Sequence, residues 1–294
     1  MYESIEEILH EEQRRGLPMW KLIQLDDCRE RGITEDEAFA MVKGLYVAMR
    51  ESNENYDPEL HSHSGLVGGL AEEYRKYAKT GNSLVGDFLS QVMEKSLRIA
   101  ESNACMKRIV AAPTAGSCGV VPAVLLSIQE RNHYTDDQMT EALYVVGGIG
   151  GVIAAKASLA GAAGGCQAEI GAASAMAAGG LTYLLGGDSA AIANAAALAL
   201  KNLLGLACDP VAGLVEVPCV KRNVCGAVNA VTSAELTMAG IRSRIPADEV
   251  FEAMNNISKS MSENIRETSA GGLAVTPTGQ RIRESLRDNG DGSF

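Results

Sequence analysis

Cys208 and Cys219 lie in the segment GLACDPVAGLVEVPC (205–219), whose two prolines make a regular helix or strand difficult to continue. A third thiol, Cys166, follows a glycine pair and precedes a helical run in AGAAGGCQAEIGAASA. We expect that helix start to favour its thiolate, because the N-terminal end of a helix dipole is positive. All three thiols therefore lie on irregular backbone with N–H groups available to sulfur. Such a thiol is a metal ligand, a nucleophile or a small buried hydrophobe.

The spacing of these cysteines does not identify a metal by itself. The three are separated by 42 and 11 residues, which is neither a zinc-ribbon pair nor a ferredoxin-type run. Cys28 and Cys105 lack Gly- or Pro-marked surroundings and are predicted to be packing residues. Cys118 and Cys225 remain ambiguous.

Four further segments have the composition of ligand-binding loops. PTAGSCG (113–119) precedes a helix with hydroxyls and N–H groups that suit a carboxylate or phosphate. HSHSGLVGG (61–69), VKRN (220–223) and ETSAGG (267–272) add histidines, cations and glycines. Turns and helix caps are the alternative interpretation of each segment. The candidate substrate-binding residues are Ser64, Gly65, Thr114, Gly116, Ser117, Lys221, Arg222, Asn223, Ser269 and Gly271, and the candidate bases are His61 and His63.

The overall composition narrows the class of protein. The 294 residues include 37 acidic and 26 basic side chains, for a net charge of -11, and no Lys/Arg run forms a phosphate-binding stripe. Nucleic acid is therefore not an expected partner. The acidic, amphipathic N-terminus does not resemble a signal peptide, so we expect a cytoplasmic location. The seven cysteines are then expected to be reduced, and an odd number makes a poor disulfide framework.

Helical signals dominate the chain. Thr34 with Glu37 and Thr135 with Gln138 have capping-box spacing, and Pro246 is followed by acidic residues, as a first helical turn prefers. Residues 143–207 are largely Ala, Gly and Leu, which predicts a tightly packed central bundle. GGIGG at 147–151 follows no predicted strand, so close helix contact is favoured over dinucleotide binding.

One membrane-spanning interpretation must be considered, because the first Ala/Gly-rich run is long enough to cross a bilayer. Lys156 interrupts that run, and the mean hydropathy of the chain is only +0.01. We therefore expect no membrane segment. The predicted fold is all-α, a single catalytic domain over 1–294 with amphipathic helices at 1–55 and a core at 60–285.

Four motifs together resemble a known family. PTAGSCGVVPAVL, AGAAGGCQAEIGAASAMAA, LACDPVAGLVEVPCVKRN and TSAGGLAVTPTG closely resemble the α chain of the iron–sulfur-dependent L-serine dehydratases, most strongly over residues 60–280. The resemblance implies an all-helical catalytic domain in which Cys166, Cys208 and Cys219 hold a [4Fe-4S] cluster and leave the fourth iron without a protein ligand. It also implies a separate β chain as partner.

The implied reaction converts L-serine to pyruvate and ammonia. The open iron would act as a Lewis acid on the substrate hydroxyl and carboxylate, and the PTAGS and TSAGG loops would meet the carboxylate. His61 or His63 would serve as the general base, unless the β chain supplies it.

Three alternatives belong to other classes. An iron–sulfur L-cysteine desulfidase would use the same thiols with sulfide as leaving group. A zinc or non-catalytic helical scaffold would use them structurally. Pyridoxal phosphate catalysis is disfavoured because Lys156 is expected in mid-helix with no phosphate-binding loop nearby.

Overall fold

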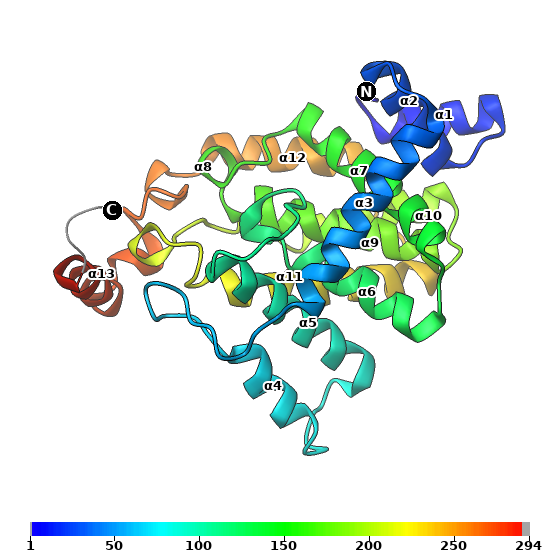
Figure 1. Ribbon diagram of the computed structural model, residues 1–294. Coiled ribbons are helices and arrows are strands. Elements are labelled where there is room, and N and C mark those ends of the chain that lie inside the picture. The colour runs from blue at the N-terminus through cyan, green and yellow to red at the C-terminus, as the bar shows by residue number, and fades with distance from the viewer. Residues whose placement is uncertain (1, 290–294) are drawn as a thin grey trace.

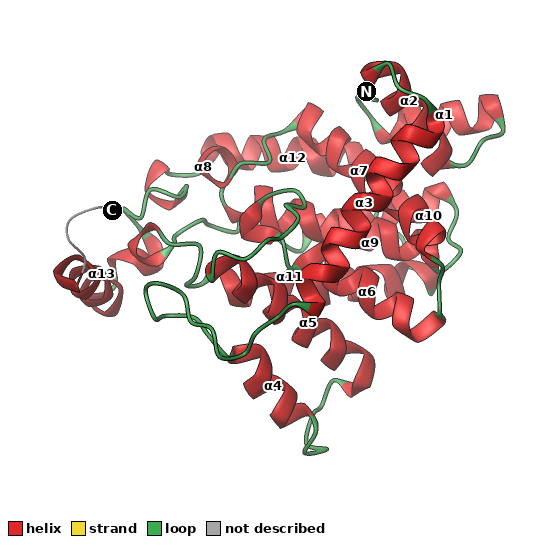
Figure 2. Cartoon of the chain, in the orientation of Figure 1, coloured by secondary structure: helices red, strands yellow, loops and turns green. Residues whose placement is uncertain are grey.

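The computed structural model describes residues 2–289, and over these residues the chain is helical and contains no β-strand (Figures 1 and 2). The predicted all-α fold class is confirmed. The α-helices of the described chain are α1 Ile5–Arg15, α2 Met19–Arg31, α3 Glu35–Glu54, α4 Leu70–Ala78, α5 Gly86–Ala104, α6 Val120–Asn132, α7 Asp136–Lys156, α8 Gly161–Gly164, α9 Ala172–Leu184, α10 Ser189–Lys201, α11 Cys219–Met238, α12 Ala247–Ser260 and α13 Pro277–Asn289.

Helix α9 forms the centre of the molecule and packs against α6, α7, α10 and α11. Its small residues let the neighbouring backbones approach closely. A Cβ atom at Gly180 would stand 2.6 Å from Val146 Cγ2 of α7, and one at Gly179 would stand 2.1 Å from Ile149 Cδ1. The predicted close packing of the Ala/Gly-rich bundle is therefore confirmed.

The GGIGG motif allows α7 to pack closely against two helices, α2 and α9. A Cβ atom at Gly148 would stand 2.3 Å from Ile23 of α2, and one at Gly150 would stand 2.9 Å from Met176 of α9. Gly147, in contrast, has no heavy atom within 4 Å of such a Cβ position. Two of the glycines are thus required by helix contacts, as predicted, and one is not.

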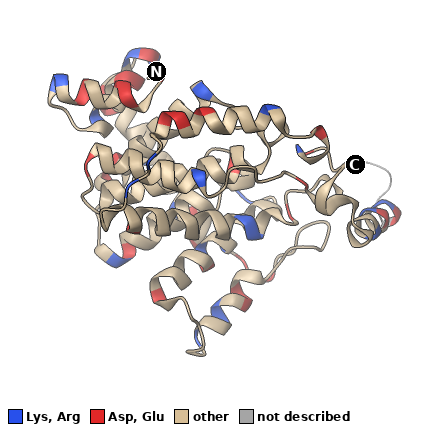
Figure 3. Cartoon of the chain, turned by 180° about the vertical axis from the view of Figure 1, so that it is seen from behind, with Lys and Arg blue, Asp and Glu red and all other residues tan. Residues whose placement is uncertain are grey.

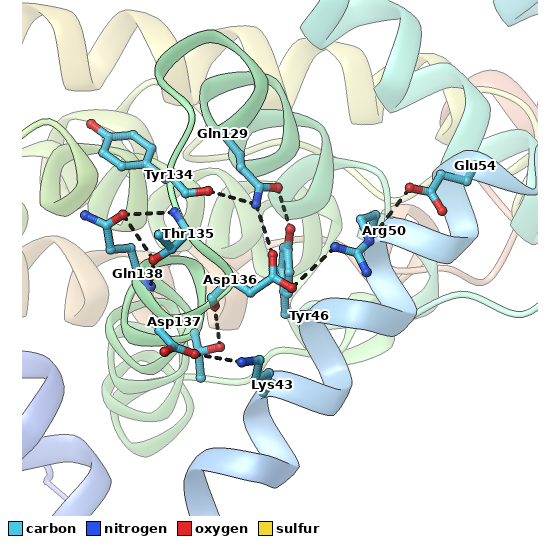
Figure 4. A network of polar contacts seen from close by, with 11 residues as sticks. Lys43, Tyr46, Arg50, Glu54, Gln129, Tyr134, Thr135, Asp136, Asp137 and Gln138 are labelled. Atoms are coloured by element: carbon cyan, nitrogen blue, oxygen red, sulfur yellow. Dashed lines mark hydrogen bonds and ion pairs between the residues drawn. The ribbon is translucent and has the colours of Figure 1, made fainter.

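The predicted helix starts also appear. Thr34 with Glu37 and Thr135 with Gln138 form complete capping boxes, and α12 begins one residue after Pro246. Figure 4 shows how α3 is tied to α6 and to the start of α7: Lys43 pairs with Asp137 of α7 at 2.7 Å, and the Tyr46 hydroxyl donates to Gln129 of α6. The exposed ion pair contributes little to stability, so packing of the apolar faces holds the helices together.

Helix α7 is the one helix of the described chain that is long and apolar enough to span a membrane. Of the apolar 18-residue stretch of this helix, 61% is buried inside the protein, where α7 packs against α2, α3 and α9. Lys156 was expected in mid-helix, but it is the last residue of α7, because Ala157 has an extended backbone. Its ammonium group lies 3.0 Å from Glu252 and 3.7 Å from Asp248 of α12.

Long loops gather at the end of the bundle away from α1 and α2 (Figure 2). In the view of Figure 3, acidic and basic residues alternate along the helices, as expected for a chain without a phosphate-binding stripe. Residues of the N-terminal helices, such as Ile5 and Met49, share one apolar core with those of α12, such as Phe251. The predicted boundary between residues 55 and 60 stays a prediction.

Candidate active site

The fold brings Cys166, Cys208 and Cys219 to one place from three separate segments. Cys166 precedes a π-helical turn (Gln167–Gly171) that leads into α9, and Cys219 is the first residue of α11. Cys208 lies on extended backbone, where its N–H donates to the carbonyl of Ile265 at 2.8 Å. The charge of Cys166 raises the pKa of both other thiols, and that of Cys219 raises the pKa of Cys208. The three thiols are therefore close enough to influence one another electrostatically, with Cys166 and Cys208 buried and Cys219 partly buried.

Burial dominates the protonation of these thiols. It raises the pKa of Cys166 to about 11 and that of Cys219 to about 12, and it also raises the pKa of Cys208. The expected preference of Cys166 for the thiolate is therefore wrong for the cluster-free chain, because desolvation outweighs the helix start and the lowering effect of Arg222.

The remaining cysteines lie elsewhere. Cys118 is fully buried and its thiol donates to the carbonyl of Ile99, and Cys28 is buried on α2. Cys105 directly follows α5, and Cys225 is exposed on α11. None of these four is among the groups that shift the pKa of the three site thiols.

Arg222 connects the cysteine segments. Its Nη1 donates to the carbonyl of Ala207 at 2.7 Å, and its Nη2 donates to Asp209 Oδ1 at 2.8 Å. Its positive charge also lowers the pKa of the Cys166 thiol against the larger raising effect of burial. The other Asp209 oxygen accepts from the N–H of Leu273 at 2.8 Å. The 267–275 loop is thereby tied to the cysteine loop.

Glu169 is a site residue that the sequence analysis missed. The Thr114 hydroxyl donates to its Oε1 at 2.8 Å, and burial raises its pKa. A Cβ atom at Gly161 would stand 2.7 Å from Glu169 Oε2 and 3.2 Å from Cys208 Sγ, so the carboxylate and the thiol border the same glycine. The sequence does contain one indication of a special role, because Glu169 is the only glutamate in the Ala/Gly-rich stretch between residues 143 and 207.

Glu216 is the second missed residue, and it ties the histidine loop to the cysteine loop. The hydroxyls of Ser62 and Ser64 both donate to its Oε2, at 2.9 and 2.5 Å. His61 and His63 are exposed on this loop, which turns at Gly65 with φ 74°. The loop therefore reaches the site, and a catalytic role for either histidine stays a prediction.

Several predicted substrate-binding residues make contacts within the chain. Asn223 is buried: its Oδ1 accepts from the N–H of Gly119 at 2.9 Å, and its amide donates to the carbonyl of Gly116 at 2.8 Å. Ser117 is also buried, and the Ser269 hydroxyl donates to the carbonyl of Pro210 at 2.7 Å. These side chains position the loops.

The other predicted substrate-binding residues have different surroundings. Lys221 is exposed on α11. Gly271 packs against Asn264, since a Cβ there would stand 2.7 Å from its carbonyl oxygen. Ligand binding by any of the predicted residues stays a prediction.

The donor set fits an iron–sulfur cluster. Within the described residues, no group of three or more His, Cys, Asp or Glu side chains is arranged to hold a metal ion. A [4Fe-4S] cluster bonds each thiolate through a different iron, so its ligands stand further apart than those of a single ion. Two buried thiols and one partly buried thiol, all with raised pKa values, suit such a group, because a coordinating metal deprotonates its thiols.

An apolar pocket of about 290 Å³ lies elsewhere, between α2, α3 and α7. Pro113 lines it, but none of the predicted site residues does. The pocket is therefore separate from the thiol site.

Comparison with known proteins shows the family of this chain. The family model of the serine dehydratase alpha chain matches residues 5–274. The chain is 41% identical to the probable L-serine dehydratase alpha chain of Bacillus subtilis over 97% of this chain and 95% of the relative. It is 40% identical to the L-serine dehydratase alpha chain of Peptoniphilus asaccharolyticus, over 99% and 100%. It is also 35% identical to the L-serine dehydratase of Helicobacter pylori, over 94% of this chain and 62% of that longer one. This chain belongs to the serine dehydratase alpha chain family.

Proposed function

We propose that this chain is the α chain of an L-serine dehydratase that converts L-serine to pyruvate and ammonia. The observation that carries the proposal is that the fold brings Cys166, Cys208 and Cys219 within electrostatic reach of one another, with Arg222 and Glu169 beside the Cys208 segment. The family match over most of the chain supports it.

The three cysteines would hold a [4Fe-4S] cluster. When bound, the iron without a protein ligand supplies Lewis acidity to the substrate hydroxyl and carboxylate. The chain itself keeps the site partly dry, since Cys166 and Cys208 are each 3% exposed.

Glu169 is suited to hold the ammonium group of L-serine. A partly buried carboxylate attracts a cation more strongly than an exposed one does. Gly116 and Gly161 leave its oxygens accessible, because a Cβ at either position would stand 3.3 or 2.7 Å from them. The Thr114 hydroxyl fixes the orientation of the carboxylate through the hydrogen bond to Oε1.

The proton on Cα must go to a base close to the bound substrate. His61 and His63 are candidates, because Glu216 anchors their loop three residues before Cys219. A separate β chain is the other source, in keeping with the alpha-chain names of the relatives.

Anaerobic purification followed by assay of iron, acid-labile sulfide and zinc tests the proposal. We expect four irons and four sulfides per chain, and pyruvate formation from L-serine when the β chain is added. Stoichiometric zinc, or iron without sulfide, would contradict the cluster. Sulfide release from L-cysteine without pyruvate from L-serine would identify a desulfidase instead.

A further inference from the structure

Arg222 links the segment that carries Cys208 to the helix that begins at Cys219, and its charge acts on Cys166. It lies three residues after Cys219, one turn along α11, so the two side chains share a helix face. Its guanidinium donates to the carbonyl of Ala207 and to the carboxylate of Asp209, the residues on either side of Cys208. Its positive charge also acts on the thiol of Cys166, where it opposes the effect of burial on the pKa.

The burial and geometry of the Arg222–Asp209 ion pair favour an arginine at this position. The side chains of Arg222 and Asp209 are only 18% and 7% exposed, so the ion pair is largely desolvated. Two donor atoms of a rigid, planar guanidinium reach two acceptors that flank one residue, a geometry that the single ammonium of lysine does not reproduce. Asp209 in turn accepts from Leu273, and Gly272 packs against it, since a Cβ there would stand 2.3 Å from Oδ2.

We infer that Arg222 is a positioning residue for the iron–sulfur cluster: it ties the segment of Cys208 to the helix of Cys219 and supplies a positive charge near the sulfur atoms of Cys166 and Cys219. This role rests on the proposed function and differs from the substrate-binding role expected from the sequence. A cluster with three thiolate ligands concentrates negative charge in a buried site, and a fixed cation stabilises it. Hydrogen bonds to the ligand sulfurs also tune cluster stability and potential.

Three variants separate this role from a general effect on folding. Arg222→Lys keeps the positive charge but loses the planar guanidinium group and its two separate donor atoms. Arg222→Met removes the charge but leaves Asp209 buried without its cation, which destabilises the fold itself. The double variant Arg222→Met/Asp209→Asn removes both charges and keeps an acceptor for Leu273. Arg14→Met is the matched control, because it removes an exposed arginine from α1.

The full chain is reconstituted anaerobically with ferrous iron and sulfide. Iron and sulfide content, the rate of iron release to a chelator, and the melting temperature of the cluster-free protein are then measured. We expect the double variant to melt like the cluster-free wild type but to release iron about 10-fold faster or more. Arg222→Lys should fall between it and the wild type, and the control should match the wild type.

Two outcomes would overturn the inference. One is native iron content and native release rate in both the Lys and the double variants. The other is iron loss that follows the fall in melting temperature across all variants, which indicates a purely structural arginine. A wild-type chain that holds no iron and sulfide would refute the proposed function instead, and the inference with it.

Discussion

The central bundle and the cysteine loops are held together by different forces. In the bundle, α9 packs closely against its neighbours through buried Ala, Gly and Leu residues. In the loops, hydrogen bonds and an ion pair determine the geometry. Cys208 forms backbone hydrogen bonds with Ile265 and Glu267, both at 2.8 Å. Asp209 accepts from both Arg222 and the N–H of Leu273. Apolar burial thus stabilises the fold, whereas a few directional contacts determine where the thiols lie. Changes in the two regions should therefore have separable effects.

The largest effect should follow from changing the thiols. Cys166→Ser, Cys208→Ser or Cys219→Ser should abolish the visible absorbance of the cluster and reduce pyruvate formation by about 100-fold or more, because hydroxyl oxygen is a poor ligand for cluster iron. The melting temperature of the cluster-free protein should change little. Absorbance and pyruvate are measured anaerobically with the β chain present.

Cys225→Ser is the matched control for these variants, because this thiol is exposed on α11 six residues after Cys219. It should keep native absorbance and activity. Equal losses in all four variants would show that the cluster ligands are misassigned.

The next effect belongs to the bundle. Gly180→Val should lower the free energy of unfolding by about 2 kcal/mol, because its Cβ would overlap Val146 Cγ2 at 2.6 Å and the β-branched Val146 has little rotamer freedom in a helix. The measurement is the thermal or urea midpoint by circular dichroism. Iron content per folded chain should stay native, and a selective loss of iron would show that the bundle and the loops are coupled.

A smaller effect is expected where the two loops meet. Glu216→Leu removes the acceptor of the Ser62 and Ser64 hydroxyls and should free the histidine loop from the cysteine loop. We expect about a 10-fold loss of pyruvate formation, equivalent to about 1.4 kcal/mol, with unchanged iron content. Hydrogen exchange should rise over residues 61–69. Native activity with a freed loop would refute a catalytic role for His61 and His63.

The structure of the bundle could be predicted from the sequence better than the geometry of the cysteine loops, because the bundle depends on local patterns and the loops depend on long-range polar contacts. Helix positions and the bundle follow from local signals, such as the capping box at Thr34 and the small residues at Gly148 and Gly150. The three thiols were singled out by their Gly- and Pro-marked backbone and by the resemblance of their motifs. Glu169 and Glu216 were missed, because their roles depend on contacts with residues 55 and more than 150 positions away. No local pattern encodes such contacts.

The smallest effect is expected at Gly147, a glycine of the bundle that, unlike Gly180, has space for a side chain. Gly147 lies on the same helix as Val146, yet a Cβ added there meets no heavy atom within 4 Å. Gly147→Ala should therefore stabilise the protein by up to about 1 kcal/mol, because alanine loses less backbone entropy than glycine in a helix interior. The urea midpoint should rise, while iron content and pyruvate formation stay native. A destabilised Gly147→Ala protein would show that this position also needs close contact, and that glycine in α7 cannot be divided into required and replaceable positions.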